Sequence, residues 1–130
     1  MKDLARIKLY EADHYIEDAV ARVQRDDEYS PSVAVAHATD ALILAVDVLC
    51  HEHNEPVSRR HDNASKVFLQ LIHDKKIPES ASQWRRLLAK AHAERTAIQY
   101  RGTMVSRAEA RRFVREAQGF LAFVRSEVQP

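Results

Sequence analysis

Apolar residues recur at helical spacing along most of this chain and predict five helical segments. In the first segment, over residues 3–28, Asp3 stands where a capping carboxylate belongs. The apolar positions that follow alternate at intervals of four and three, and they are Ala5, Leu9, Ala12, Ile16, Ala19 and Val23. The pattern predicts a long amphipathic helix of the kind that belongs to a helical bundle.

The second segment is apolar on most of its circumference, which predicts that it is the central helix. Ser30 is expected to be its N-cap, with Pro31 at the first helical position, and Asn54-Glu-Pro56 is expected to end it near residue 53. Its one polar stripe is expected to face solvent or another subunit. That stripe consists of His37, Asp40, Asp47 and His51, with Leu44 among them.

Three further segments complete the pattern. A third helix is expected over residues 62–75, before Pro78, and a fourth over residues 79–99, before a turn at Gly102. A fifth is expected to begin at Ser106, an N-cap with Glu109 at the capping-box position. The apolar seam of the fifth consists of Ala110, Phe113, Ala117, Phe120 and Val124.

Composition supports an all-α fold. The chain has 130 residues, enough for one domain with a real core, and contains only 2 glycines and 4 prolines among many strong helix formers. We therefore expect residues 1–130 to form a single up-and-down bundle of four to five helices. Cys50 is the one cysteine, and its apolar neighbours indicate a buried thiol in a reducing compartment. We find no signal-type segment and no run long enough to span a bilayer, so a cytoplasmic protein is expected.

Charge is distributed unevenly along the chain. Residues 1–82 hold 10 Lys and Arg against 15 Asp and Glu, a net charge of −5, and residues 83–130 hold 10 against 4, a net charge of +6. In the fifth segment Arg107, Arg111 and Arg115 are each four residues apart and form one stripe, with Arg101 in the turn before it. Such a stripe is typical either of a solvated face or of a surface that binds phosphate.

Arg95 is the most informative residue of the fourth segment. It lies on an apolar seam with Trp84, Leu88, Ala91 and Ile98. A buried guanidinium without a partner is costly, so Arg95 must meet a carboxylate, reach backbone carbonyls or open onto a cleft that takes an anion. The sequence leaves open a structural ion pair and a ligand site. Tyr100 and Arg101 follow closely, a ring able to stack on a base beside a cation able to hold phosphate.

Several features occur in a familiar order. A small-residue helix over residues 32–44 is followed by Arg60-His61-Asp62 before Phe68, then by Arg95 near the end of the fourth segment. The last segment has the pattern Ser106-Arg-Ala-Glu-Ala110-Arg-Arg-Phe-Val-Arg-Glu-Ala117. In this order and spacing the chain resembles a HEPN domain, the helical nucleotide- and RNA-directed domain of prokaryotic toxin modules and host-defence proteins. The resemblance covers most of the chain.

The resemblance implies RNA or nucleotide as ligand, a homodimer, and a nucleotidyltransferase partner protein. Ribonucleases of this family carry an arginine followed four to six residues later by a histidine; Arg95 matches the arginine, but Tyr100 stands in the histidine position and no histidine follows His92. A phenol, with a reference pKa of about 10, exchanges protons poorly near neutral pH. Arg95 and Tyr100 are the candidate catalytic pair, with cleavage left open, and His92, Arg101, Arg107 and Arg111 are candidate ligand contacts.

Two other hypotheses belong to different classes. Glu11, His14 and Asp18 in the first segment, facing the stripe of the second, have the spacing of metal ligands in helical bundles, although they lie opposite the apolar seam, where solvated residues belong. The favoured expectation is therefore no metal and no cofactor. The other hypothesis is a catalytically inactive dimeric interaction module, suggested by the large apolar surface of the second segment.

Overall fold

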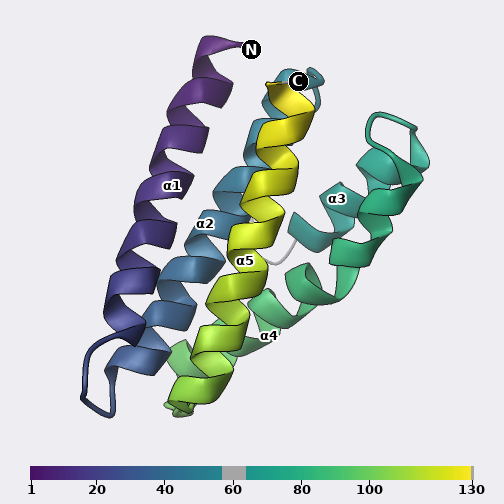
Figure 1. Ribbon diagram of the computed structural model, residues 1–130. Coiled ribbons are helices and arrows are strands. Elements are labelled where there is room, and N and C mark those ends of the chain that lie inside the picture. Colours follow the sequence, from purple (N-terminus) through teal and green to yellow (C-terminus); the bar gives the residue numbers. More distant parts are fainter. Residues whose placement is uncertain (57–63, 130) are drawn as a thin grey trace.

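The protein is an all-α bundle, as the sequence predicts. The computed structural model describes residues 1–56 and 64–129. Its elements in chain order are α1 (Asp3–Val23), α2 (Ser30–Glu52), α3 (Ala64–His73), a 3₁₀ segment η2 (Glu79–Trp84), α4 (Arg85–Arg101) and α5 (Arg107–Val128). Figure 1 shows α1, α2 and α5 side by side and α4 crossing them obliquely. α3 lies beside η2 and α4 and also contacts α2. The first turn of α1 and the last turn of α5 lie at the same end of the bundle (Figure 1).

The central position predicted for the second helix is confirmed. α2 contacts α1, α3, α4 and α5, and most of its side chains are buried. By length and composition alone α2 could also cross a membrane, but most of its apolar stretch is covered by the bundle, as in any core helix. Cys50 of α2 is fully buried, and burial raises the pKa of its thiol to about 12. The thiol therefore stays protonated and packs as a small apolar group.

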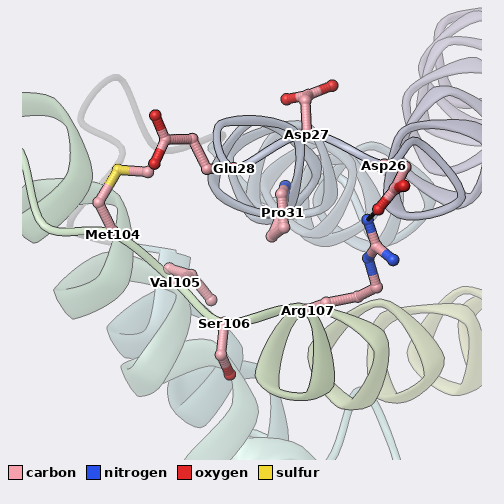
Figure 2. A pocket seen from close by; sticks show the side chains of 8 residues that line it. All are labelled: Asp26, Asp27, Glu28, Pro31, Met104, Val105, Ser106 and Arg107. Atoms are coloured by element: carbon pink, nitrogen blue, oxygen red, sulfur yellow. Dashed lines mark hydrogen bonds and ion pairs between the residues drawn. The ribbon is translucent and has the colours of Figure 1, made fainter.

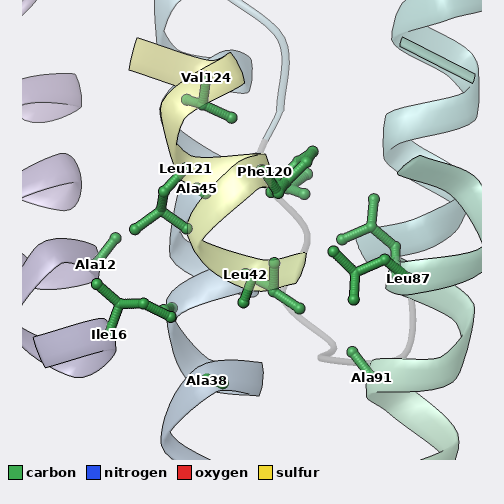
Figure 3. Packing of buried hydrophobic residues seen from close by; sticks show 14 of the residues in the cluster. Ala12, Ile16, Ala38, Leu42, Ala45, Leu87, Ala91, Phe120, Leu121 and Val124 are labelled. Atoms are coloured by element: carbon green, nitrogen blue, oxygen red, sulfur yellow. The ribbon is translucent and has the colours of Figure 1, made fainter. Parts of the chain in front are cut away.

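Alanines bring the three main helices close together. The predicted seams of α1 and α5 are buried throughout. Figure 3 shows Ala12 and Ile16 of α1 and Leu121 of α5 pointing toward a common space against α2. The alanines of this contact that have no exposed surface are Ala5, Ala12 and Ala19 of α1, Ala34, Ala38, Ala41 and Ala45 of α2, and Ala110 and Ala117 of α5. Small side chains at these positions let the helix backbones approach closely.

An aromatic cluster attaches α3 and η2 to the bundle. Phe120 of α5 lies edge-on to Phe68 of α3 and to Trp84 of η2, with ring centroids 5.5 and 5.7 Å apart. A Cβ atom at Gly119 would lie 3.0 Å from the Trp84 ring. Glycine at this position therefore leaves room for the indole to lie against α5.

The predicted N-caps of the first two helices are wrong, and α1 ends at Val23 rather than near residue 28. Asp3 is the first helical residue and makes no capping hydrogen bond. At α2 the acceptor is Asp27, whose carboxylate accepts the Ser30 hydroxyl at 2.6 Å and the Ser30 amide at 2.8 Å. Ser30 thus donates its hydroxyl proton instead of accepting a bond. By contrast, the predicted cap of α5 is confirmed, because Ser106 accepts the Glu109 amide at 3.2 Å.

The helix predicted over residues 79–99 is divided. Residues 79–84 form the 3₁₀ segment η2, and α4 then runs from Arg85 to Arg101, where Gly102 adopts the left-handed conformation expected of a C-terminal glycine (φ 64°). Ala81 is the one fully buried residue of η2, and Trp84 at its end packs against Phe120. The predicted start of the third helix at residue 62 lies outside the described residues.

Enlarging an alanine of the α1 seam should destabilise the protein. We expect Ala12→Leu to lower the free energy of unfolding by about 1–3 kcal/mol, because the extra atoms force α1 away from α2 and α5. Ala21 lies on the exposed side of the same helix, so Ala21→Leu should change stability by less than about 0.5 kcal/mol. Urea unfolding of both variants measures the difference, and equal destabilisation would contradict the close packing.

The Asp27 cap should make stability depend on pH. The hydrogen bonds from the side chain and amide of Ser30 lower the pKa of Asp27 below its ordinary 3.8. Because the pKa of Asp27 is lower in the folded than in the unfolded protein, the cap stabilises the fold fully at a pH above the pKa of the unfolded state. This stabilisation is lost as the pH falls through the pKa of the folded state. Asp27→Asn should therefore melt at a lower temperature than wild type at pH 7, and the two melting curves should converge in acid. In the control variant Asp18→Asn, which removes an exposed carboxylate of α1, we expect no such pH-dependent difference in melting temperature from wild type.

Candidate nucleic-acid interface

Arg95 faces α2 and forms an ion pair there. Leu88 and Ala91 are buried on the same side of α4, and they orient the helix so that Arg95 points toward the bundle. The Arg95 guanidinium donates a hydrogen bond to the carboxylate of Asp40 on α2, and both side chains are 25% exposed. The structural ion pair that the sequence left open is therefore present. Asp40 belongs to the polar stripe of α2, which is partly exposed except at Asp47.

A small cavity lies beside Arg95. Arg95 and His92 line a cavity of about 10 Å³ together with Thr39 and Ala91. Sites for small ligands usually measure about 300–1,000 Å³. This cavity is therefore far too small for a nucleotide. His92 itself is exposed, and its carbonyl accepts the Thr96 hydroxyl at 3.0 Å.

Arg101 lies on another side of α4. It is six positions beyond Arg95, so its Cα is about 9 Å further along the axis and about 120° away around it. Arg101 is exposed, whereas Arg95 is held against α2 by its ion pair with Asp40. The fold therefore does not bring these two guanidinium groups together. The side chain of Tyr100 lies outside the described residues, as do Arg60, His61 and Asp62.

Arg107 contacts the connection between α1 and α2. Its guanidinium donates to the backbone carbonyl of Arg25 and lies 3.3 Å from the carboxylate of Asp26. Figure 2 shows Arg107 pointing to Asp26 across one end of an open pocket of about 560 Å³, with Glu28 and Met104 at the other end. Three carboxylates and one guanidinium line this pocket, which gives it a formal charge of −2. It is poorly suited to an anionic ligand.

The remaining arginines of α5 are available to a ligand. Arg111, Arg112 and Arg115 are exposed on the side of α5 opposite its buried seam. In the part of the chain that the structure describes, none of the three makes an ion pair, whereas Arg107 and Arg125 are both paired with carboxylates. The stripe predicted from the sequence is thus divided into a structural residue, Arg107, and two free cations, Arg111 and Arg115.

Two structural contacts of the second half could not be found from spacing. Arg125 of α5 pairs with Asp13 of α1. Ser32, in the first turn of α2, accepts the amide of Val105 at 3.0 Å and so fixes the connection between α4 and α5. Both contacts join residues more than 70 positions apart, and the sequence contains no local signal for either of them.

The metal hypothesis gains no support from the geometry. Glu11, His14 and Asp18 are exposed on the outer side of α1. Over residues 1–56 and 64–129, no three His, Cys, Asp or Glu side chains converge on a point that could hold a metal ion. His37 instead packs edge-on against Tyr15 of α1, with ring centroids 6.0 Å apart.

Comparison with known proteins adds no assignment. No protein-family model matches the chain, and no curated protein matches it. Any function proposed for this protein therefore rests on the residues themselves and on the resemblance in the order of motifs.

The Arg95–Asp40 pair should stabilise the contact between α4 and α2. We expect Arg95→Ala and Asp40→Ala each to lower the free energy of unfolding by about 1–3 kcal/mol, since each leaves a partly buried charge without its partner. The loss of unfolding free energy in the double variant should be about 1 kcal/mol smaller than the sum of the losses in the two single variants. The exposed pair of Arg6 and Asp3, 3.9 Å apart, is the control and should show a coupling energy near zero.

Proposed function

We propose that this bundle binds RNA, or the phosphate groups of nucleotides, through exposed arginines of its C-terminal half. The observation that carries the proposal is the exposure of Arg111 and Arg115 without ion pairs among the described residues. They are one helical turn apart, so they can contact neighbouring phosphates of one strand. Arg101, exposed at the end of α4, adds a third cation, and Tyr100 offers a ring on which a base can stack.

In this proposal Arg95 has a positioning role. Its pair with Asp40 holds the second half of α4 against α2, and so places Arg101 and Tyr100 at the end of that helix. A ligand phosphate at Arg95 would compete with Asp40 for the guanidinium. The proposed contact is therefore centred on the exposed arginines, in contrast to the arrangement that the HEPN resemblance implies.

The proposal is one of binding, and cleavage is a separate question. Strand cleavage by attack of the 2′-hydroxyl gains from a group that exchanges protons near pH 7. The phenol of Tyr100 has a reference pKa of about 10. His92, the nearest histidine, is exposed and lies one turn before Arg95. The proposal therefore assigns no proton carrier.

RNA retention on a filter tests the proposed contact. We expect Arg111→Gln combined with Arg115→Gln to weaken binding of a mixed RNA pool, and to reduce the slope of log K against log salt by about 0.7 for each phosphate that the protein no longer neutralises. The control is Arg6→Gln combined with Arg25→Gln, which removes the same charge from α1 and its connection. If both double variants lose affinity equally, binding is non-specific attraction and the proposed surface is wrong.

The same assay decides about cleavage. Loss of cleavage in Arg95→Ala or Tyr100→Phe, in a variant that stays folded, would make the protein a ribonuclease that works without the usual histidine. Retention without cleavage supports a binding module. No retention of any RNA would favour the second candidate function.

That second candidate is a protein-interaction module, and one observation favours it. Four large apolar or aromatic residues of α1 are exposed. They are Leu4 (48%), Ile7 (54%) and Tyr10 (67%), together with Tyr15 (36%), which also packs against His37 of α2. Exposed apolar groups gathered on one helix are typical of surfaces that meet another protein. A second copy of this chain, or the nucleotidyltransferase partner that the resemblance implies, is a candidate for that contact.

A further inference from the structure

A second pocket lies between α3 and the start of α4. Its volume is about 660 Å³, within the usual range of about 300–1,000 Å³ for sites that bind small molecules. Ser65 and Leu69 of α3 form one wall, and Ser82 and Gln83 of η2, followed by Arg85 and Arg86 of α4, form the other. None of the RNA contacts proposed above lines it.

The fold fixes the arginines at this pocket. Leu87 and Leu88 are buried, so the opposite side of the first turns of α4 points outward. Arg85, Arg86 and Ala89 share that outward side. The 3₁₀ turn that precedes α4 brings Ser82 and Gln83 next to them. Two guanidinium groups therefore stand at one edge of a concave surface, with donors from a second element beside them.

The chemistry of the lining favours an anion. Within the described residues, neither Arg85 nor Arg86 forms an ion pair, and no described acidic residue lines the pocket. This contrasts with Arg95, which is neutralised by a carboxylate from another helix. Guanidinium groups donate two parallel hydrogen bonds to phosphate oxygens, and the serine hydroxyls and glutamine amide supply further donors.

The apolar part of the lining limits the kind of anion. Leu69 and Ala89 contribute apolar surface between the polar groups. A bare inorganic ion leaves that surface unused, whereas a phosphorylated small molecule places its phosphate at the arginines and its carbon skeleton on the apolar patch. We propose that this pocket binds the phosphate group of a small phosphomonoester, held by Arg85 and Arg86 with the hydroxyls of Ser65 and Ser82.

Isothermal titration calorimetry can measure binding at this pocket. Ribose 5-phosphate is a suitable probe, because ribose is its matched control without phosphate. We expect a saturable heat of binding with ribose 5-phosphate and none with ribose.

Substitution of the two arginines locates the site. Arg85→Gln combined with Arg86→Gln should raise the dissociation constant about tenfold or more, as expected for the loss of charge-assisted bonds. Both side chains are exposed, so the variant should stay folded. Arg6→Gln combined with Arg25→Gln removes the same charge from α1 and the connection after it. This control should change the dissociation constant by less than about twofold, which corresponds to less free energy than one hydrogen bond.

Three results would overturn the inference. The first is the absence of a saturable response to ribose 5-phosphate, and the second is an equal loss of affinity in both double variants. The third is displacement of ribose 5-phosphate by a short RNA with a 5′-hydroxyl end, which would assign the pocket to nucleic acid. RNA retention is measured separately through Arg111 and Arg115, so failure of this inference leaves the proposed function untouched.

Discussion

The fold depends on the enclosure of α2. A helix that is apolar on most of its circumference must be covered on several sides, because each exposed apolar side chain forgoes about 1.5–3 kcal/mol of burial. α1 and α5 cover it along its length, and α4 crosses a third side. These helices present single apolar seams to α2, so their polar sides face outward. The positions of the exposed arginines on α4 and α5 follow from that arrangement.

Charge pairing then separates the arginines into two groups. The first half of the chain is acidic and the second half basic. Arg95, Arg107 and Arg125 each pair with a carboxylate from the first half, namely with Asp40, Asp26 and Asp13. These pairs tie α4 and α5 to the acidic helices. Among the described residues of the second half, the arginines without a carboxylate partner lie at the start of α4, at its end and along the outer side of α5, and both proposals concern them.

The sequence predicts the helices and their buried seams well, because helical periodicity is a local property. The seams of α1 and α5 and the cap at Ser106 are confirmed for that reason. The partner of Arg95 could not be predicted, since Asp40 is 55 residues away and its position depends on how α4 crosses α2. The cap of α2 differs from the prediction because Asp27 and Ser30 are both good capping residues. Only the path of the backbone decides which of the two side chains accepts the capping hydrogen bond. The pocket beside Arg85 joins three elements, one of them the 3₁₀ turn that periodicity had merged with α4.

The alanine contacts between the three main helices limit where evolution can place a new binding site in such a protein. Where backbones touch through methyl groups, no internal chamber can open without separating the helices. New ligands must therefore be accommodated at the margins, on outward-facing turns and at joints such as the one between α3 and α4. Substitutions there leave the scaffold intact. One bundle of this kind can thus acquire or lose a binding activity while its interior stays the same.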